Sequence, residues 1–250
     1  MRPVVAPCGV DGLCPVAMER VSFVKMHGCG NDFVVVDRRC AAVPLTPDLA
    51  CRIADRHRGV GFDQLILLEP GEGAEVLLRF LNADGSESGA CGNGTRCAAR
   101  LLFDEGAPER LVIRVGERRL VATRLPDGRI AVEMGEPGLG WRDVPLAEPC
   151  DTAELPIAVE GLPAPAAVGM GNPHLVFVVP DLAALDVELL GARLERHPLF
   201  PERANVGFAQ VLAPGVLRLR VFERGVGLTL ACGSGACAAM VTARRRGLVG

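Results

Sequence analysis

The sequence carries one cysteine-glycine motif twice, as ACGNGTRC at residues 90–97 and as ACGSGAC at residues 231–237. In each copy, a cysteine and two glycines stand directly before a run of helix-forming residues. Glycines let the backbone approach a ligand closely, and the first N–H groups of a helix attract negative charge. Each copy therefore predicts a helix that begins beside a thiol and a row of free amide groups. Two such helix starts indicate one shared site.

Further landmarks recur at nearly the same spacing, which indicates a duplicated domain. The spacing is 141 residues for three pairs, which are Asn31 and Asn172, Asn82 and Glu223, and Cys91 and Cys232. The triplet VGF at residues 60–62 recurs at 206–208, at a spacing of 146. A nearly fixed spacing is typical of a repeated unit. A duplicated fold places its equivalent loops face to face across a cleft, where ligand sites prefer to form.

The composition is that of a globular protein and argues against several classes of partner. Of the 250 residues, 49% are hydrophobic and 23% are charged, and the net charge is −3. The only block of like charge is Arg244 to Arg246, which closes a predicted helix, so we expect no nucleic acid partner. No apolar run approaches the roughly 20 residues of a membrane span, so we expect no membrane partner.

Residues 1–17 are expected to form an irregular leader, with Met18 as an alternative start. The leader lacks the continuous apolar stretch of a secretory signal, so we expect a cytoplasmic protein. The ten cysteines are then expected to be reduced, with catalytic or buried roles rather than disulfides.

Hydrophobic periodicity and turn residues predict elements in the same order in both halves. The expected strands are 21–25, 33–37, 65–68, 75–81, 111–115, 118–124, 130–134, 166–170, 175–179, 206–212 and 216–222. The expected helices are a short one that begins after the N-cap Thr46, and 94–104, 182–196 and 234–246. Glycine and proline enrichment across 135–150 predicts a link between domains. We therefore expect an N-terminal domain at 18–136 and a C-terminal domain at 137–250.

The two motif cysteines, Cys91 and Cys232, have the placement of acid and base catalysts. A helix N-terminus is expected to lower a thiol pKa toward neutrality. Two thiols that face each other, one ionised and one protonated, would remove a proton from one side of a carbon and add one to the other. That arrangement suits inversion of a stereocentre. The remaining cysteines beyond the leader are expected to be buried apolar side chains without a metal: Cys29, Cys40, Cys51, Cys97, Cys150 and Cys237.

Polar side chains fall on predicted strand ends and turns around these thiols, namely Asn31, Gln64, Asn82, Asn93, Asn172, Asn205, Glu223 and Arg224. A single asparagine beside glycine is usually only a turn former, but this set recurs in both halves. Arg224 can hold a carboxylate through two N–H groups, and Glu223 can hold an ammonium group. The expected ligand is a zwitterion with more than one charged end.

Eight stretches, in order from about residue 20 onward, resemble the diaminopimelate epimerase family. They are KMHGCGNDF at 25–33, GVGFDQ at 59–64, NADGS at 82–86, CGNG at 91–94, GNPH at 171–174, NVGF at 205–208, ERG at 223–225 and ACGSG at 231–235. The resemblance implies an α+β fold of two pseudo-symmetric domains, each a mixed, mostly antiparallel barrel-like sheet around a central helix. It also implies epimerisation of LL-2,6-diaminopimelate to meso-2,6-diaminopimelate, in lysine and peptidoglycan biosynthesis, by a homodimer that uses no cofactor.

The resemblance implies a role for each matching residue. Cys91 and Cys232 would be the two catalytic thiols, and His27 and His174 are expected as supporting residues. The substrate would be held by a set drawn from all the motifs: Asn31, Gln64, Asn82, Gly92, Asn93, Asn172, Asn205, Glu223, Arg224, Gly233 and Ser234. Pyridoxal phosphate is not expected, because its Schiff base needs a lysine. The only lysine, Lys25, lies on a predicted strand far in sequence from both cysteine motifs.

Two features depart from the family pattern. Leu228 stands where the pattern has glutamate, and this change would remove a carboxylate near Cys232. Family members also continue with further strands beyond the helix that ends this chain, so we expect an incomplete C-terminal domain. Two alternatives to the epimerase therefore stay open. One is an isomerase similar to proline or hydroxyproline racemase, and the other is an inactive truncated paralogue that only binds ligand.

Overall fold

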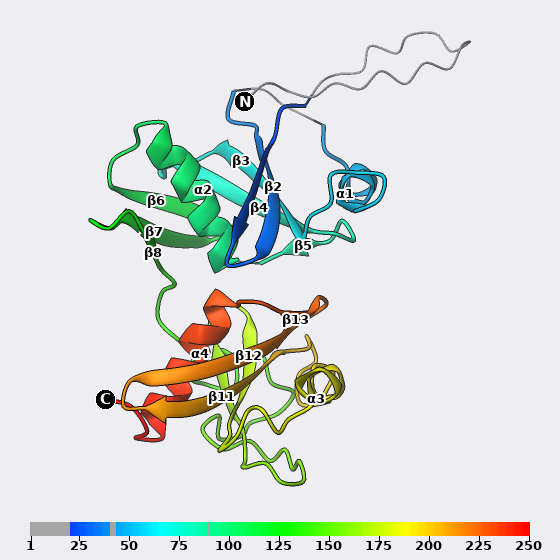
Figure 1. The fold of residues 1–250 in the computed structure, drawn as a ribbon, viewed down its shortest axis with the longest axis vertical. Coiled ribbons are helices and arrows are strands. Elements are labelled where there is room, and N and C mark those ends of the chain that lie inside the picture. The colour runs from blue at the N-terminus through cyan, green and yellow to red at the C-terminus, as the bar shows by residue number, and fades with distance from the viewer. Residues whose placement is uncertain (1–20, 41–43, 90) are drawn as a thin grey trace.

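The computed structural model describes residues 21–40, 44–89 and 91–250, so the expected leader at 1–17 and the alternative start at Met18 lie outside the described residues. The described chain forms two lobes stacked along the long axis of the molecule (Figure 1). The first lobe contains β1 (Val24–Gly28), β2 (Asn31–Asp37), α1 (Pro47–Ala54), β3 (Gln64–Pro70), β4 (Val76–Asn82), β5 (Glu87–Ser88), α2 (Gly92–Asp104), β6 (Arg110–Val115), β7 (Arg118–Arg124) and β8 (Ile130–Glu133). The second lobe contains β9 (Ala166–Gly169), β10 (Pro173–Val178), α3 (Val187–Leu194), β11 (Asn205–Ala213), β12 (Val216–Glu223), β13 (Gly227–Thr229) and α4 (Gly233–Arg245).

Each lobe is built on one mixed sheet. The first sheet has the order β1-β2-β3-β4-β6-β7-β8, with β5 paired to β4, and the second has the order β13-β12-β11-β10-β9. Parallel pairing is limited to β2 with β3 and β4 with β6 in the first sheet, and to β10 with β11 in the second. The remaining pairs are antiparallel. The predicted α+β class, with two mostly antiparallel sheets, is confirmed.

Strand pairing shows the duplication and sets its register. Phe33 pairs with Gln64 across β2 and β3, and His174 pairs with Asn205 across β10 and β11. Equivalent positions in both strands are therefore 141 residues apart, the spacing of the two cysteines. The VGF triplets at 60–62 and 206–208 are not equivalent positions, and this landmark of the sequence argument is wrong. Their spacing of 146 would shift one strand by five residues against its partner.

Helices cover both faces of each sheet. Successive strand residues point to opposite faces, so Phe33 and Ile66 bury against α2, whereas Val34 and Leu65 bury on the α1 side. The second lobe repeats this layering, with Val168 and Val176 on the α4 side and Phe177 on the α3 side. Both helices that carry a cysteine motif thus lie against a sheet whose strand ends carry the polar set.

The segment predicted as a link, 135–150, is only partly a connection. Val144 is fully buried and Leu146 is 5% exposed, and both belong to the core on the α3 side of the second sheet. The chain there is irregular but ordered by backbone hydrogen bonds, such as Leu146 N to Trp141 O at 2.9 Å. The domain boundary after residue 136 stays a prediction.

The third helix is shorter than the predicted 182–196. It begins after Asp186, whose side chain accepts a hydrogen bond from Leu189 N at 3.0 Å and so caps the helix. Residues 182–185 form a turn before this cap, and Leu182 packs into the core. The strands β5 and β13 were not predicted, because two or three residues carry no readable periodicity. None of the helices in the described parts of the chain is long and apolar enough to cross a membrane.

Candidate active site

Cys91 and Cys232 are the N-cap residues of α2 and α4. Each has an extended backbone, and each sulfur accepts a hydrogen bond from the N–H three residues further on. The distances are 3.3 Å from Gly94 N to Cys91 Sγ and 3.4 Å from Gly235 N to Cys232 Sγ. This is the contact that a capping serine makes, with sulfur in place of oxygen. Both helices therefore begin at a thiol, as the sequence predicts.

The two helix starts meet at the junction between the lobes (Figure 1). A Cβ built on Gly92 would lie 3.9 Å from the Cα of Gly233, and Asn93 Nδ2 donates to the Ala231 carbonyl oxygen at 2.8 Å. Glycine without a side chain is what lets two backbones come this close. The two motif copies therefore build one junction with a thiol on each side.

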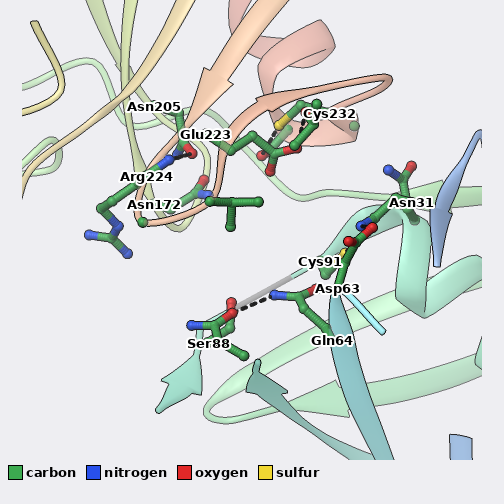
Figure 2. A pocket seen from close by; sticks show the side chains of 18 of the residues that line it. Asn31, Asp63, Gln64, Ser88, Cys91, Asn172, Asn205, Glu223, Arg224 and Cys232 are labelled. Atoms are coloured by element: carbon green, nitrogen blue, oxygen red, sulfur yellow. Dashed lines mark hydrogen bonds between the residues drawn. The ribbon is translucent and has the colours of Figure 1, made fainter. Parts of the chain in front are cut away.

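A cavity of about 340 Å³ opens beside the thiols (Figure 2). It is lined by both cysteines and by every residue for which the resemblance implies substrate binding: Asn31, Gln64, Asn82, Gly92, Asn93, Asn172, Asn205, Glu223, Arg224, Gly233 and Ser234. A cavity of this size with many polar groups suits a small, multiply charged ligand.

The cavity also has lining residues that the sequence reasoning missed, among them Asp63, Ser86, Ser88, Glu202, Arg203, Val226 and Thr229. Four of them could have been found. Asp63 and Ser86 lie inside the family-like motifs, and Val226 and Thr229 lie in the short segment between two of these motifs. Glu202 and Arg203 lie outside all the motifs and reach the cavity only through the turn before β11.

Hydrogen bonds hold much of the polar lining in place before any ligand arrives. Gln64 Nε2 donates to Asn82 Oδ1 at 2.9 Å across adjacent strands. In the second lobe, the Arg224 backbone N donates to Asn205 Oδ1 at 3.0 Å, and Arg224 Nη1 donates to the Glu202 carbonyl at 2.9 Å. The Arg224 guanidinium keeps further N–H groups for a carboxylate.

Glu223 lies beside Cys232 on the second side of the cavity (Figure 2). Thr229 Oγ1 donates to Glu223 Oε1 at 2.5 Å, which fixes the carboxyl group. Burial raises the pKa of Glu223, because a charged carboxylate is poorly solvated there. Glu223 is thus a carboxyl group that can hold a proton or face an ammonium group next to the thiol.

Both thiols titrate above the ordinary range in the free protein. Burial, supported by the charge of Glu223, raises the pKa of Cys232 to about 12, and the same two causes raise the pKa of Cys91 to about 12. The helix N–H groups lower both values, as the sequence argument expects, but burial outweighs them. The net direction is therefore opposite to the sequence prediction, and both thiols are protonated at neutral pH.

The two histidines of the motifs have different surroundings. His174 is fully buried on β10, and its Nε2 lies 2.9 Å from Asn172 Oδ1. Burial, followed by the nearby charge of Arg224, lowers the pKa of His174 to about 3, so the ring is neutral and can orient the Asn172 amide. His27 is exposed on β1 and lies outside the cavity lining.

Two further positions from the sequence analysis lie outside the cavity lining: Lys25, the only lysine, and Leu228, which departs from the family pattern. Lys25 is exposed on β1 and forms an ion pair with Asp32 at 2.6 Å. Leu228 is 37% exposed on β13 and is not part of the cavity lining, whereas its neighbour Thr229 is. Because strand residues alternate, the side chain at 228 points away from the thiols.

Comparison with solved structures shows which proteins share this fold. It matches a probable proline racemase from Agrobacterium radiobacter at a TM-score of 0.64, with 17% identity, over 92% of this chain and 78% of that one. A hydroxyproline epimerase from Agrobacterium vitis matches at a TM-score of 0.62, with 17% identity, over 91% of this chain and 78% of that one. The protein has the two-lobed fold found among amino-acid racemases and epimerases.

Comparison with known sequences assigns the chain to one family with this fold. The family model for diaminopimelate epimerase matches residues 23–139 and 166–250. Diaminopimelate epimerase from Acidiphilium cryptum is 58% identical over 226 residues, which cover 90% of this chain and 82% of that relative. The same enzyme from Phenylobacterium zucineum is 53% identical over 232 residues, which cover 91% and 84%. The chain belongs to the diaminopimelate epimerase family.

Proposed function

We propose that this protein interconverts LL-2,6-diaminopimelate and meso-2,6-diaminopimelate by proton transfer at one α carbon. The observation that carries this proposal is the meeting of two helices that each begin at a cysteine and open on one cavity. Membership of the epimerase family supplies the substrate. The step breaks the C–H bond on one face and forms a C–H bond on the other, so no oxidant or reductant is consumed.

The two thiols would divide the proton transfer between them. One sulfur, as thiolate, takes the α proton and becomes a thiol, while the other thiol donates its proton to the opposite face and becomes a thiolate. Running the reaction backward exchanges the roles of Cys91 and Cys232. Because both thiols are protonated in the free protein, one must release its proton to solvent water when substrate binds. The ammonium group of a substrate next to the sulfur favours that loss.

The helix starts would stabilise the charge that develops at the reacting carbon. Removal of the α proton places negative charge on the adjacent carboxylate. Backbone N–H groups at the starts of α2 and α4, together with the side chains of Asn93 and Ser234, line the cavity where this carboxylate would lie. Fixed amide donors of this kind stabilise such charge without reorganising during the reaction.

The second charged end of the substrate would be held by the second lobe. Arg224 can bind a carboxylate, Glu223 an ammonium group, and Asn172 and Asn205 supply amide groups. Gln64 and Asn82 would complete the binding set from the first lobe. Proline and hydroxyproline have no second amino-acid end, so this polar set favours diaminopimelate over a proline racemase substrate.

The wider setting is also proposed from sequence. A cytoplasmic protein, a homodimer, a reaction without cofactor or metal, and a substrate on the route to lysine and peptidoglycan all agree with family membership. His174 would support the site by orienting Asn172, and the exposed His27 has the weaker geometry for such a role.

The test is α-proton exchange followed by NMR in deuterated water. With LL-diaminopimelate we expect loss of the α-proton signal and appearance of the meso isomer, while L-proline and trans-4-hydroxy-L-proline stay protonated. Exchange of the proline substrates alone would assign the racemase instead. Calorimetric binding of diaminopimelate without any exchange, by protein that is folded by circular dichroism, would assign the inactive ligand-binding paralogue.

A further inference from the structure

A cluster of charged side chains adjoins Asn31 in the first lobe. It consists of Asp63, Asp32, Arg56 and Lys25, and only Asp63 reaches the cavity lining. The proposed reaction assigns none of these four residues a part in holding substrate or moving a proton. Asp63 contacts the Asn31 side chain, which in turn contacts the Cys91 thiol.

The contacts form a short chain from the thiol to the charged cluster. Cys91 Sγ donates to Asn31 Oδ1 at 3.6 Å, and Asn31 Nδ2 donates to Asp63 Oδ2 at 2.9 Å. Asp63 Oδ2 also accepts from the Asp32 backbone N at 2.9 Å, and Asp63 N donates to Asp32 Oδ1 at 3.0 Å. The carboxylate is therefore anchored to β2 as well as to the amide.

The orientation of the Asn31 amide decides what the sulfur faces. An amide has one acceptor end and one donor end, and an ionised carboxylate only accepts. With its NH₂ group turned to Asp63, Asn31 must present its oxygen to Cys91. An oxygen acceptor stabilises a thiol, which has a proton to donate, and disfavours a thiolate.

The outer residues of the cluster keep Asp63 in place. Arg56 Nη2 bridges Asp63 Oδ1 and Asp32 Oδ1, both at 2.8 Å, and Lys25 Nζ pairs with Asp32 Oδ2 at 2.6 Å. Burial raises the pKa of Asp32, but hydrogen bonds from Arg56 and Lys25 outweigh it and hold that pKa well below its usual range. Asp32 therefore stays charged throughout the neutral range and keeps Arg56 in place beside Asp63.

The second lobe has no such cluster. At the shared spacing of 141 residues, Asp63 corresponds to Ala204 and Asp32 to Pro173. Asn172, the counterpart of Asn31, has its oxygen facing His174 instead of a thiol. Cys232 has Ser234 Oγ at 3.6 Å, an atom that can donate or accept, and it also contacts the Glu223 carboxyl group instead of an amide.

We propose, on the basis of the two-thiol reaction above, that Asp63 is a positioning residue that fixes the Asn31 amide with its oxygen toward Cys91 and so keeps this thiol protonated in the free protein. The device acts on one side of the site alone. Both thiols are protonated before substrate binds, but each is held by different partners, Cys91 by the Asn31 amide and Cys232 by Ser234 and Glu223.

The test is the rate at which iodoacetamide alkylates each thiol in the full chain between pH 7 and 9, read by mass spectrometry of the two cysteine peptides. In Asp63→Ala, which carries the residue type of the other lobe, we expect Cys91 to react about tenfold faster, as for a fall of one pKa unit. Cys232 should stay within about twofold and serves as the internal reference. Asp37→Ala removes a carboxylate that pairs with Arg39 at the far end of β2, the strand that begins at Asn31, and should change neither rate.

A double-mutant cycle separates positioning from simple charge. In an Asn31→Ala background, Asp63→Ala should no longer change the Cys91 rate, because the amide through which it acts is gone. The same acceleration in both backgrounds would overturn the proposal, since it would show a direct effect of the lost charge. No acceleration in the single variant would overturn it as well.

A second variant covers the case of misfolding, and the alkylation assay does not depend on catalysis. If Asp63→Ala does not give a folded protein by circular dichroism, Asp63→Asn is used, because its amide no longer dictates the orientation of Asn31, and it should accelerate Cys91 in the same direction. Alkylation reports on Asn31 and Cys91 whether or not the protein turns over substrate. Failure of the epimerase assay with a positive cycle would therefore reject the proposed function and leave this inference standing.

Discussion

The helices α2 and α4 begin alike but end in different surroundings. At the spacing of 141 residues, Ala99 in α2 corresponds to Met240 in α4, and Thr95 corresponds to Ala236. Ala99 and Thr95 are fully buried, whereas Met240 is 42% exposed and Ala236 is exposed. The first sheet continues from β4 into β6, β7 and β8, and the last two of these contact α2. Among the described residues, the second sheet has no matching strands beside α4.

This difference separates the part of a lobe that lines the active-site cavity from the strands that only cover its helix. Both lobes supply the same core unit, four strands and a helix that starts at a cysteine. The cavity is lined by this unit in each lobe. The enclosing strands β6 to β8 do not reach the cavity. Substitutions where strands cover the helix should therefore change the free energy of unfolding, and substitutions at the helix starts should change the rate of epimerisation.

The largest effect is expected from the thiols themselves. Cys91→Ala and Cys232→Ala should each lower the rate of epimerisation by about 10³-fold or more, because one face of the α carbon then lacks its proton donor or acceptor. Cys97→Ala, which shortens a buried side chain in α2, should keep at least about a third of the activity. Steady-state rates on LL-diaminopimelate measure all three. Equal losses in the three variants would indicate that the thiols are structural and would contradict equivalent catalytic roles for Cys91 and Cys232.

The next effect is a difference in stability when the same substitution is made at equivalent positions of α2, which is covered by strands, and α4, which is not. Ala99→Gln forces a longer polar side chain between α2 and its sheet and should destabilise the protein by about 2–4 kcal/mol. Met240→Gln replaces a half-exposed side chain of similar length and should change stability by less than about 0.5 kcal/mol. Urea unfolding of both variants gives the comparison. Similar losses at the two sites would mean that the open face of α4 is covered in solution.

A smaller effect follows from the raised pKa of the thiols. An unfolded thiol ionises near pH 9, while Cys91 in the folded protein keeps its proton to about pH 12. The unfolded state therefore loses protons first as pH rises, so folding stability falls above pH 9, by up to about 1.4 kcal/mol per pH unit per thiol. Urea unfolding at pH 9 and pH 10 should show a shallower loss in Cys91→Ala than in the unsubstituted protein. Parallel losses would contradict the raised pKa.

The smallest effect is expected at Leu228, where the chain departs from the family pattern. Its side chain lies outside the cavity lining, so Leu228→Glu should change the rate of epimerisation by less than about twofold. A steady-state assay beside Thr229→Val, which removes the hydroxyl that holds Glu223, makes the comparison. A gain of tenfold or more in the glutamate variant would show that position 228 acts on Cys232 after all.

Much of the fold could be predicted because its signals are local. Thr46 and the two cysteine motifs mark helix starts, and the predicted strands at 111–115 and 118–124 agree with β6 and β7 within a residue. The failures are also local in origin. The third helix was predicted too long because a cap at Asp186 competes with an apolar run that starts at Leu182. Residues 135–150 were predicted to be a link because buried irregular chain has no periodicity.

The members of the site were largely predicted from the repeat, but its electrostatics were not. A helix N-terminus can be read from sequence, and it predicts a lowered thiol pKa. The depth of burial around Cys91 and Cys232 cannot be read from sequence, and it reverses the direction. The same limit applies to Asp63, whose importance depends on contacts with Asn31 and Arg56 across three segments of the chain.

By itself, the sequence determined the duplication, the two helix starts, the thiols at them and the family, because each rests on residue types at fixed spacing along the chain. Only the tertiary structure decided that the two starts touch through Gly92 and Gly233, and that Thr229 faces the site while Leu228 does not. It also decided that Asp63 contacts Asn31 beside Cys91, whereas the equivalent position in the second lobe is Ala204. These properties depend on distances between segments far apart in sequence, which packing sets and local pattern does not encode.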